Sequence, residues 1–405
     1  MVIRRHLRPG HALQLLEGGS QLFAAMVQAI DHAQVFVWVE TYILQAVNSP
    51  VRVLKALERA AQRGLDVRLM VDAVGTPKLD PVWAQRLQDA GVMYRIYRPM
   101  GRLGLLIPSR WRRLHRKLCV VDGVLGFCGG INLIDDLDDV ALGRLDQPRL
   151  DFALQVQGPL VQNMQHTMDT LWWRTTLAHD MVRRDFALAW AHWQAHRQPL
   201  PLPVRPTPHG VQTHSAQAAL LLRDNILHRH HIERAYLKAI GESRESIMIA
   251  NAYLIPGRRL RRALRVAVQR GVRVQLLIQG RYESFLQYHA ARPVHAVLLR
   301  AGVEIYEYEP SALHAKVAVV DGRWATVGST NLDPLSLLLA REANIITTDR
   351  DFAHQLQARL QALVQAHGRQ LDVESLHARP WWQRWQDVAA FAIMRTVLFL
   401  TGHRY

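Results

Sequence analysis

The sequence predicts an α/β fold built from two similar halves, and three observations lead to this expectation. The stretch "LHRKLCVVDG" (Leu114 to Gly123) recurs two hundred residues later as "LHAKVAVVDG" (Leu313 to Gly322). Apolar, β-prone runs alternate with amphipathic helical segments, which is typical of helices layered on a largely buried sheet. A proline-rich segment separates the two copies. We therefore expect two tandem α/β/α sandwich domains.

The repeat extends well beyond the ten matching residues. Each half begins with a strand-like run that ends in a polar residue and a tyrosine. An amphipathic helix, an Arg-Gly stop and a second strand follow, and a further helix and strand precede the motif. A strand and a helix come after it. The matched pairs are residues 35–44 with 246–255, 56–73 with 263–280, 87–97 with 298–308, and 150–161 with 341–352.

These matches define the expected domain boundaries. The first domain covers residues 1–195 and the second covers 216–368. Between them, residues 196–215 form a linker that we expect to be extended, because five prolines fall within His196 to Gly210. Residues 369–405 form an aromatic and basic amphipathic tail.

Composition restricts the partners of the chain. Its 405 residues, 49% of them hydrophobic, suffice for two domains with cores of their own. A net charge of +16 attracts polyanions, which are nucleic acid or an anionic membrane surface. The two cysteines, Cys119 and Cys128, are expected to be buried thiols in a reducing compartment. We find neither the apolar region of a signal peptide nor a run of roughly 18 apolar residues that could span a bilayer.

The repeated motif carries residues suited to phosphate chemistry. His115 and Lys117 lie two positions apart, so in a strand their side chains point to the same side. A lysine is a compact cation suited to phosphate, while glycines allow close approach and Asn or Ser add neutral donors. The expected phosphate-binding residues after the two motif strands are Gly130, Asn132, Ser329 and Asn331.

Two copies of such a motif predict one symmetric site. One histidine, His115 or His314, can attack phosphorus while the other protonates the departing alkoxide. Lys117 and Lys316 would supply the positive charge that a metal supplies elsewhere, and we expect neither metal nor cofactor. Each histidine needs a carboxylate to fix its tautomer, and Asp151 and Glu342 occupy matching places for this role. The candidate catalytic residues also include Asp122 and Asp321, although we expect these two mainly to brace the turn that follows them.

At this point the sequence resembles the phospholipase D superfamily, because both H-x-K-x4-D-x6-G-G/S-x-N motifs are intact. The likeness extends from about Leu15 to Leu363. It implies that the two halves pack face to face in a pseudo-twofold arrangement and share one active site. It further implies a phosphohistidine intermediate and no required metal. By the habit of that family, the nucleophile would be His115, although the near-symmetry of the motifs leaves the choice open.

Two regions bear on which phosphodiester is cleaved. Residues 98–117 mix arginines with aliphatic side chains and Trp111, which favours a lip among acyl chains over a groove for nucleic acid. The tail has three tryptophans followed by an apolar stretch interrupted by Arg395, which suits the interface of an anionic membrane. A plain basic loop and a tail helix packed on the protein core remain the alternatives.

Within the superfamily the overall layout is similar to the short bacterial cardiolipin synthases. This resemblance implies transfer of a phosphatidyl group from phosphatidylglycerol to a second lipid hydroxyl, on phosphatidylglycerol or phosphatidylethanolamine, with release of glycerol. It implies a peripheral enzyme at the cytoplasmic face of the bacterial inner membrane, with phospholipids and no nucleic acid as partners. The alternatives are a phospholipase D-type phosphodiesterase or nuclease and an inactive membrane-binding scaffold. The sequence makes no prediction of oligomeric state.

Overall fold

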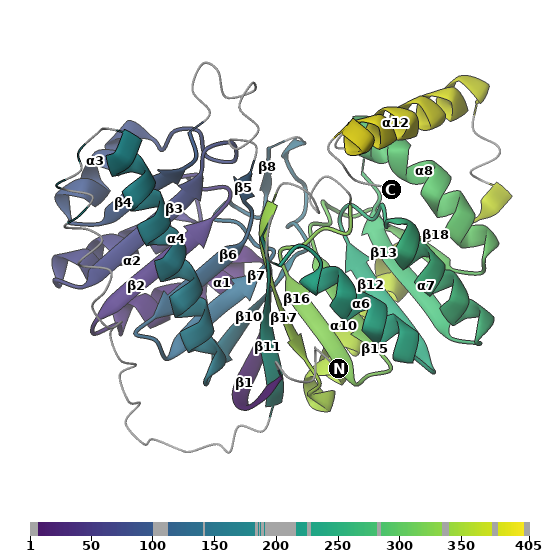
Figure 1. Cartoon of the computed structure of the whole chain (residues 1–405), viewed down its shortest axis with the longest axis horizontal. Helices are drawn as coiled ribbons and strands as arrows, with labels where there is room; N and C mark the ends of the chain where they lie inside the picture. The colour runs from purple at the N-terminus through teal and green to yellow at the C-terminus, as the bar shows by residue number, and fades with distance from the viewer. Residues whose placement is uncertain are drawn as a thin grey trace.

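A computed structural model shows most of the chain as helices packed on one large sheet, with a small separate sheet of two strands (Figure 1). The described residues are 7–99, 112–140, 142–182, 185, 187, 190, 216–224, 228–281, 285–333, 340–374 and 380–400. The predicted linker at 196–215 lies outside them, as does most of the predicted lip, including Trp111.

The first half contains ten strands and four helices in its described part. They are β1 (Arg8–Glu17), α1 (Gly18–Asp31), β2 (Phe36–Thr41), α2 (Val51–Gln62), β3 (Asp66–Asp72), α3 (Pro81–Asp89), β4 (Met93–Tyr97), β5 (Arg113–Leu114), β6 (Lys117–Val121), β7 (Leu125–Gly129), β8 (Asp138–Asp139), β9 (Gly143–Arg144), β10 (Phe152–Gln157) and α4 (Leu160–Val182).

The second half repeats most of this order. Its elements are β11 (Ala216–Arg223), α6 (His231–Glu242), β12 (Ser246–Asn251), α7 (Arg258–Gln269), β13 (Arg273–Gln279), α8 (Phe285–Arg300), β14 (Glu304–Tyr308), β15 (Lys316–Val320), β16 (Trp324–Gly328), β17 (Ala340–Thr347), α10 (Arg350–His367), β18 (Gly368–Leu371) and α12 (Trp381–Leu400).

One mixed sheet of 16 strands runs through both halves (Figure 1). The first half has the order β4-β3-β2-β6-β7-β10-β1 and the second has β14-β13-β12-β15-β16-β17-β11. The halves meet where β1 pairs antiparallel with β11, so the two orders are related by a pseudo-twofold axis at that pair. Strand β18 extends the second half by pairing with β14.

The hydrophobic core is continuous between the halves. Phe152 and Leu154 of the first half share one cluster with Val317, Val327 and Ile345 of the second. Two further clusters lie mainly within one half each. The central strands β2, β6 and β15 are buried along their whole length, as expected of a sheet covered on both faces. Cys119 and Cys128 are buried free thiols in these layers, as predicted.

The C-terminal tail differs from its prediction at its start. Residues 369–371, which the sequence assigned to the tail, belong to the edge strand β18 because they continue the sheet beside β14. Helix α12 then packs on α8. Its Ala390 and Met394 are buried in the core of the second half, whereas Trp381 and Trp385 on the other face are 73% and 67% exposed. No helix in the described residues is long and apolar enough to cross a membrane.

Candidate active site

The two motifs meet at the centre of the molecule because the halves exchange backbone contacts there. The amide of His115 donates to the carbonyl of Arg341 at 3.0 Å, and short strand β5 pairs with β17 of the other half. The amide of His314 donates to the carbonyl of Leu150 at 2.8 Å. Each motif histidine is therefore bonded to the other half, at the residue just before the candidate carboxylate Glu342 or Asp151.

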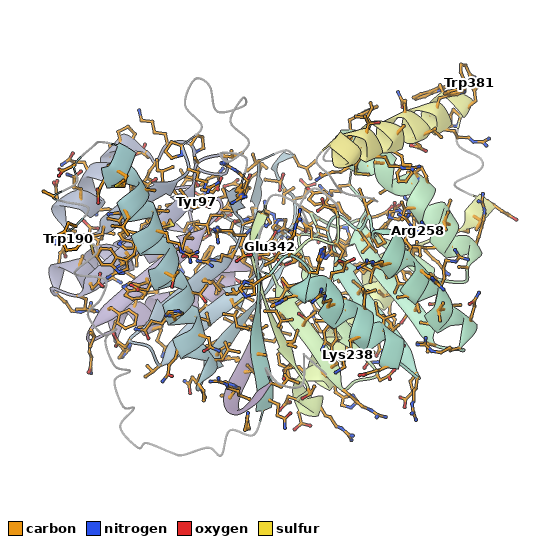
Figure 2. The ribbon with its side chains drawn as sticks, in the orientation of Figure 1. Tyr97, Trp190, Lys238, Arg258, Glu342 and Trp381 are labelled. Carbon is orange, nitrogen blue, oxygen red and sulfur yellow. The ribbon has the colours of Figure 1, made fainter. Side chains whose placement is uncertain are left out.

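Each motif histidine contacts the carboxylate of the opposite half. The Nδ1 atom of His115 lies 3.0 Å from Oε1 of Glu342, and Nδ1 of His314 lies 2.6 Å from Oδ2 of Asp151. Figure 2 shows Glu342 at the centre of the molecule. Because an ionised carboxylate only accepts hydrogen bonds, it fixes the hydrogen on Nδ1 and leaves Nε2 available for a reacting group. The sequence predicted both carboxylates but did not predict the crossed pairing.

Burial makes the two histidine–carboxylate pairs electrostatically unequal. It lowers the pKa of His115, and it lowers that of His314 well below its usual value, with Lys316 adding to the effect. Burial raises the pKa of Asp151 to about 6. Burial alone would raise the pKa of Glu342 as well, but His115, Lys117 and the Ser329 hydroxyl hold it below its ordinary value. Glu342 is therefore the more firmly ionised of the two carboxylates.

The two motif lysines are buried beside the histidines. Lys117 Nζ donates to the carbonyl of His115 at 2.7 Å, and Lys316 Nζ donates to the carbonyl of His314. Burial lowers the pKa of Lys117 to about 7. A buried ammonium is stabilised by a bound anion, so the site favours a phosphate group as its ligand.

Gly130 and Ser329 both lie against the candidate carboxylates. Gly130 makes room for Asp151, because a Cβ atom at this position would lie 2.3 Å from Oδ1 of that carboxylate. Its amide is already bonded to the carbonyl of Phe152. The Ser329 hydroxyl donates its single hydrogen to Glu342, and its amide bonds to the carbonyl of Ala343. These contacts give both residues a role in positioning the carboxylates, and their binding of phosphate stays a prediction.

The two asparagines remain candidates for binding the phosphate. The side-chain oxygen of Asn132 accepts from the amide of Ile43 at 3.1 Å, which leaves its NH2 group for another acceptor. Asn331 is buried, and its side-chain oxygen has no hydrogen-bond partner in the described part of the chain. The binding roles of both side chains stay predictions.

The side chains of Asp122 and Asp321 hold the loops that lead into β2 and β12, rather than the turns that follow the two aspartates. Asp122 accepts hydrogen bonds from three successive amides, at residues 34–36, and Asp321 accepts from those at residues 244–246. Each aspartate lies five residues beyond its motif lysine, or roughly 16 Å along an extended strand. These contacts favour a structural role for the two aspartates, as we expected, and their inclusion with the catalytic residues stays a prediction.

Sequence reasoning missed one aromatic ring at the site and a buried ion pair next to the first motif. The ring of Tyr42 lies 4.9 Å from that of His115 and 5.5 Å from Lys117 Nζ, measured to ring centroids. Its match with Tyr253 in the repeat was the available signal. Arg116, between the motif histidine and lysine, forms a buried ion pair with Glu40 at 2.8 Å. Nothing in the local pattern distinguishes that pair from an exposed one.

No group of three or more His, Cys, Asp or Glu side chains in the described ranges is arranged to hold a metal ion. The assembled site consists of two imidazoles, each with a buried carboxylate, and two ammonium groups. Such a set can form a bond to phosphorus through one imidazole and move a proton through the other.

The sequence of the chain matches a known protein family. A sequence profile described as "Cardiolipin synthase, PLD-like domain" matches residues 26–137 and 236–375. Cardiolipin synthase B of Salmonella typhi is 38% identical over 397 residues, covering 98% of this chain and 90% of that protein. Cardiolipin synthase B of Escherichia coli (strain K12) is 36% identical over 397 residues, with the same coverage.

A solved structure shows the same fold. The phosphatidylserine synthase of Haemophilus influenzae Rd KW20 matches with a TM-score of 0.67 at 13% identity, covering 97% of this chain and 96% of that one. The predicted class, two tandem phospholipase D-type α/β/α sandwich domains in pseudo-twofold arrangement, is thereby confirmed.

Proposed function

This chain belongs to the family of phospholipase D-like cardiolipin synthases, and we propose that its composite site joins two phosphatidylglycerol molecules into cardiolipin and glycerol. The observation that carries the proposal is the crossed pairing of two partly buried histidines with two buried carboxylates, beside two buried lysines. This arrangement supports a site in which one histidine is the nucleophile and the other carries a proton for the same phosphate.

The difference between the carboxylates supports His115 as the nucleophile. A phosphorylated imidazole carries positive charge, and an ionised carboxylate at Nδ1 stabilises it. Glu342, with its lowered pKa and its hydrogen bond from Ser329, suits this role beside His115. Asp151 has a pKa raised to about 6 by burial, closer to that of a histidine, and so suits a pair that exchanges protons.

The first step cleaves the donor lipid. Nε2 of His115 attacks the phosphorus of phosphatidylglycerol, and the bond from phosphorus to the glycerol headgroup oxygen breaks. His314 gives its proton to that oxygen, and glycerol leaves. Bound phosphate favours the protonated form of His314, because the anion offsets the positive charge of the nearby lysines. Lys117, Lys316 and the two asparagines hold the phosphate oxygens as charge moves.

The second step forms the product. His314, now neutral, takes the proton from a headgroup hydroxyl of the second lipid. The resulting oxygen attacks phosphorus, the bond to Nε2 of His115 breaks, and cardiolipin forms while His314 is again protonated. Water in place of the lipid hydroxyl would give phosphatidic acid, so the balance of products reports how well water is excluded.

The surface supports a location on an anionic membrane. The net charge is +16, and the outward face of α12 exposes Trp381, Trp385 and Val388 at a spacing of four and three residues. Aromatic and apolar side chains on one helical face, with basic residues beside them, suit the lipid–water interface. We further propose that the chain is peripheral and works at the cytoplasmic face of a bacterial inner membrane.

Product analysis by mass spectrometry tests the proposal. Purified protein is incubated in chelator with phosphatidylglycerol vesicles, with mixed phosphatidylglycerol and phosphatidylethanolamine vesicles, and with single-stranded DNA. We expect cardiolipin and glycerol from the first, and the second decides whether phosphatidylethanolamine also accepts. Phosphatidic acid alone would identify a hydrolase, cleaved DNA would identify a nuclease, and binding without any product would identify a scaffold.

A further inference from the structure

A basic groove lies on the second half, away from the catalytic centre. Helices α7, α8 and α12 border it, and its volume is about 830 Å³. These helices gather at one end of the molecule (Figure 1), and Figure 2 shows Arg258 of the groove apart from Glu342 of the active site. Five arginines line the groove: Arg258, Arg261, Arg262 and Arg265 from α7, and Arg395 from α12.

The arginines of α7 form one stripe along the helix. Their spacing of three and four residues places them on the same side of the helix, where like charges repel. They also occupy the first two turns, where the positive end of the helix dipole disfavours cations. No acidic side chain lines the groove, and no ion pair joins Arg258, Arg262 or Arg265 to an acidic residue among those described. The cluster therefore favours an anion from outside the chain.

The rest of the groove is apolar. Val266 and Val297 line it while remaining 39% and 41% exposed, and Pro293 and Phe391 lie beside them. Phe391 connects this lining to α12, whose outward face carries the exposed tryptophans. A ligand that matches both parts has a phosphate at one end and a hydrocarbon chain at the other. Single-stranded nucleic acid would favour several aromatic side chains on which successive bases stack, and Phe391 is the one aromatic residue among the described residues that line this groove.

We propose that this groove is a second, non-catalytic binding site for one anionic phospholipid of the membrane. The lipid phosphate lies among Arg258, Arg262 and Arg265, and an acyl chain covers Val266 and Val297. The site anchors the second half on membranes rich in anionic lipid, which is where the substrate of the proposed reaction is found. The proposal rests on the proposed membrane location but not on the chemistry at His115 and His314.

Vesicle sedimentation tests the charged part of the site. The full-length chain carries His115→Ala so that the lipids are not consumed, and it is mixed with vesicles of phosphatidylcholine alone or with an equal part of phosphatidylglycerol. Adding Arg258→Gln, Arg262→Gln and Arg265→Gln should weaken partitioning onto the anionic vesicles by about 100-fold. The matched control, Arg52→Gln, Arg174→Gln and Arg234→Gln, removes three exposed charges from α2, α4 and α6. It should change partitioning by less than about threefold, because distant charges are screened.

A groove-filling variant tests the apolar part. Val297→Trp keeps every charge but occupies the space proposed for the acyl chain, so it should also weaken partitioning, by about tenfold. Unchanged partitioning of this variant would show that the groove acts only as a basic surface. It would overturn the proposed phospholipid site. Equal losses in the two arginine triples would overturn it as well. Thermal unfolding followed by circular dichroism checks that each variant is folded.

Two further measurements complete the test. The first distinguishes a membrane lipid from a soluble phosphate as the ligand, and the second distinguishes failure of the groove proposal from failure of the proposed function. Glycerol phosphate in solution should not release the protein from vesicles; release would identify a soluble phosphate as the ligand. In the chain with both histidines intact, the groove triple should still turn over short-chain phosphatidylglycerol dissolved as monomers. If that chain makes no cardiolipin while the sedimentation result holds, the groove stands and the proposed function fails.

Discussion

The two motifs have matching backbone arrangements but differ in the side chains that surround them. Both place a histidine, a lysine and an asparagine in the same positions, and both anchor the histidine on the opposite half. In the first half, Gly130 stands beside Asp151; in the second, Ser329 stands beside the longer Glu342 and bonds to it. Ala315 and Asn251 in the second half replace the buried ion pair of Arg116 and Glu40 in the first.

This difference shows how a duplicated fold can assign unequal roles to equal residues. The strands fix where the two imidazoles lie. The neighbouring side chains set the pKa values, which rise for Asp151 and fall for Glu342. A symmetric scaffold thus holds an asymmetric pair, and the following changes test whether that asymmetry decides the chemistry.

Removing the histidines should have the largest effect. His115→Ala should lower the rate of cardiolipin formation by at least about 10⁴-fold because the nucleophile is lost. His314→Ala should lower it by about 10²–10⁴-fold because proton transfer is lost. With a donor lipid whose leaving group needs no proton, His314→Ala should accumulate a phosphatidyl group on His115, detected by peptide mass spectrometry. An adduct on His314 in the His115→Ala protein would reverse the assignment, and half-activity in either variant would mean two independent sites.

Neutralising the carboxylates should be the next most harmful change. Glu342→Gln should reduce turnover by about 10³-fold because the charge beside the phosphohistidine is lost, and Asp151→Asn by about 10²-fold. Initial rates on dissolved short-chain lipid measure both, with thermal unfolding as the control for folding. A greater loss in Asp151→Asn would show that His314, not His115, carries the intermediate.

Converting the buried ion pair of the first half should affect stability. Arg116→Ala leaves the carboxylate of Glu40 buried without its partner, at a cost of about 3 kcal/mol in the free energy of unfolding. Adding Glu40→Asn reproduces the pair found in the second half, Asn251 and Ala315. Because the unpaired charge is then gone, the double variant should recover more than half of the loss in urea denaturation. Equal stability of the single and double variants would show that lost packing, not charge, dominates.

The turn aspartates should contribute to stability without contributing to catalysis. Asp122→Asn should cost about 2 kcal/mol, because the lost charge weakens hydrogen bonds from three amides, one of which is buried. Asp321→Asn should cost about 1 kcal/mol, since its partners are more exposed. Asparagine tolerates the positive φ of 52° at both positions, so backbone strain is not added. Turnover per folded molecule should not change, and a stable but inactive Asp122→Asn protein would contradict this assignment.

The pH profile should show the smallest effect. Lys117 must be protonated to hold phosphate, so kcat/KM should fall as pH rises through its pKa of about 7. Asp151 must be ionised to accept from His314, so kcat/KM should fall as pH drops through about 6. Each limb should change by about tenfold per pH unit, giving a bell-shaped profile on monomeric substrate. A flat profile across both limbs would show that neither group titrates in the free enzyme.

The sequence alone determined the repeat, the α/β class, the family and the residue types of the site. These follow from patterns within short windows: the alternation of strands and helices, and the spacing of a histidine, a lysine and an asparagine around one hairpin. It also indicated a structural role for Asp122 and Asp321, because each precedes a glycine, but the loops that they hold became visible only in the structure.

Only the tertiary structure decided which groups meet. His115 pairs with Glu342 across 227 positions of sequence, and His314 pairs with Asp151 across 163. No local pattern encodes such a crossing, because it arises from the packing of two halves on a shared core. The same holds for the tail: its composition allowed either a membrane helix or a packed one, and α12 buries one face on α8 while exposing the other. The arginine stripe of α7 is visible in the sequence, but it lines a groove only because α8 and α12 fold against it.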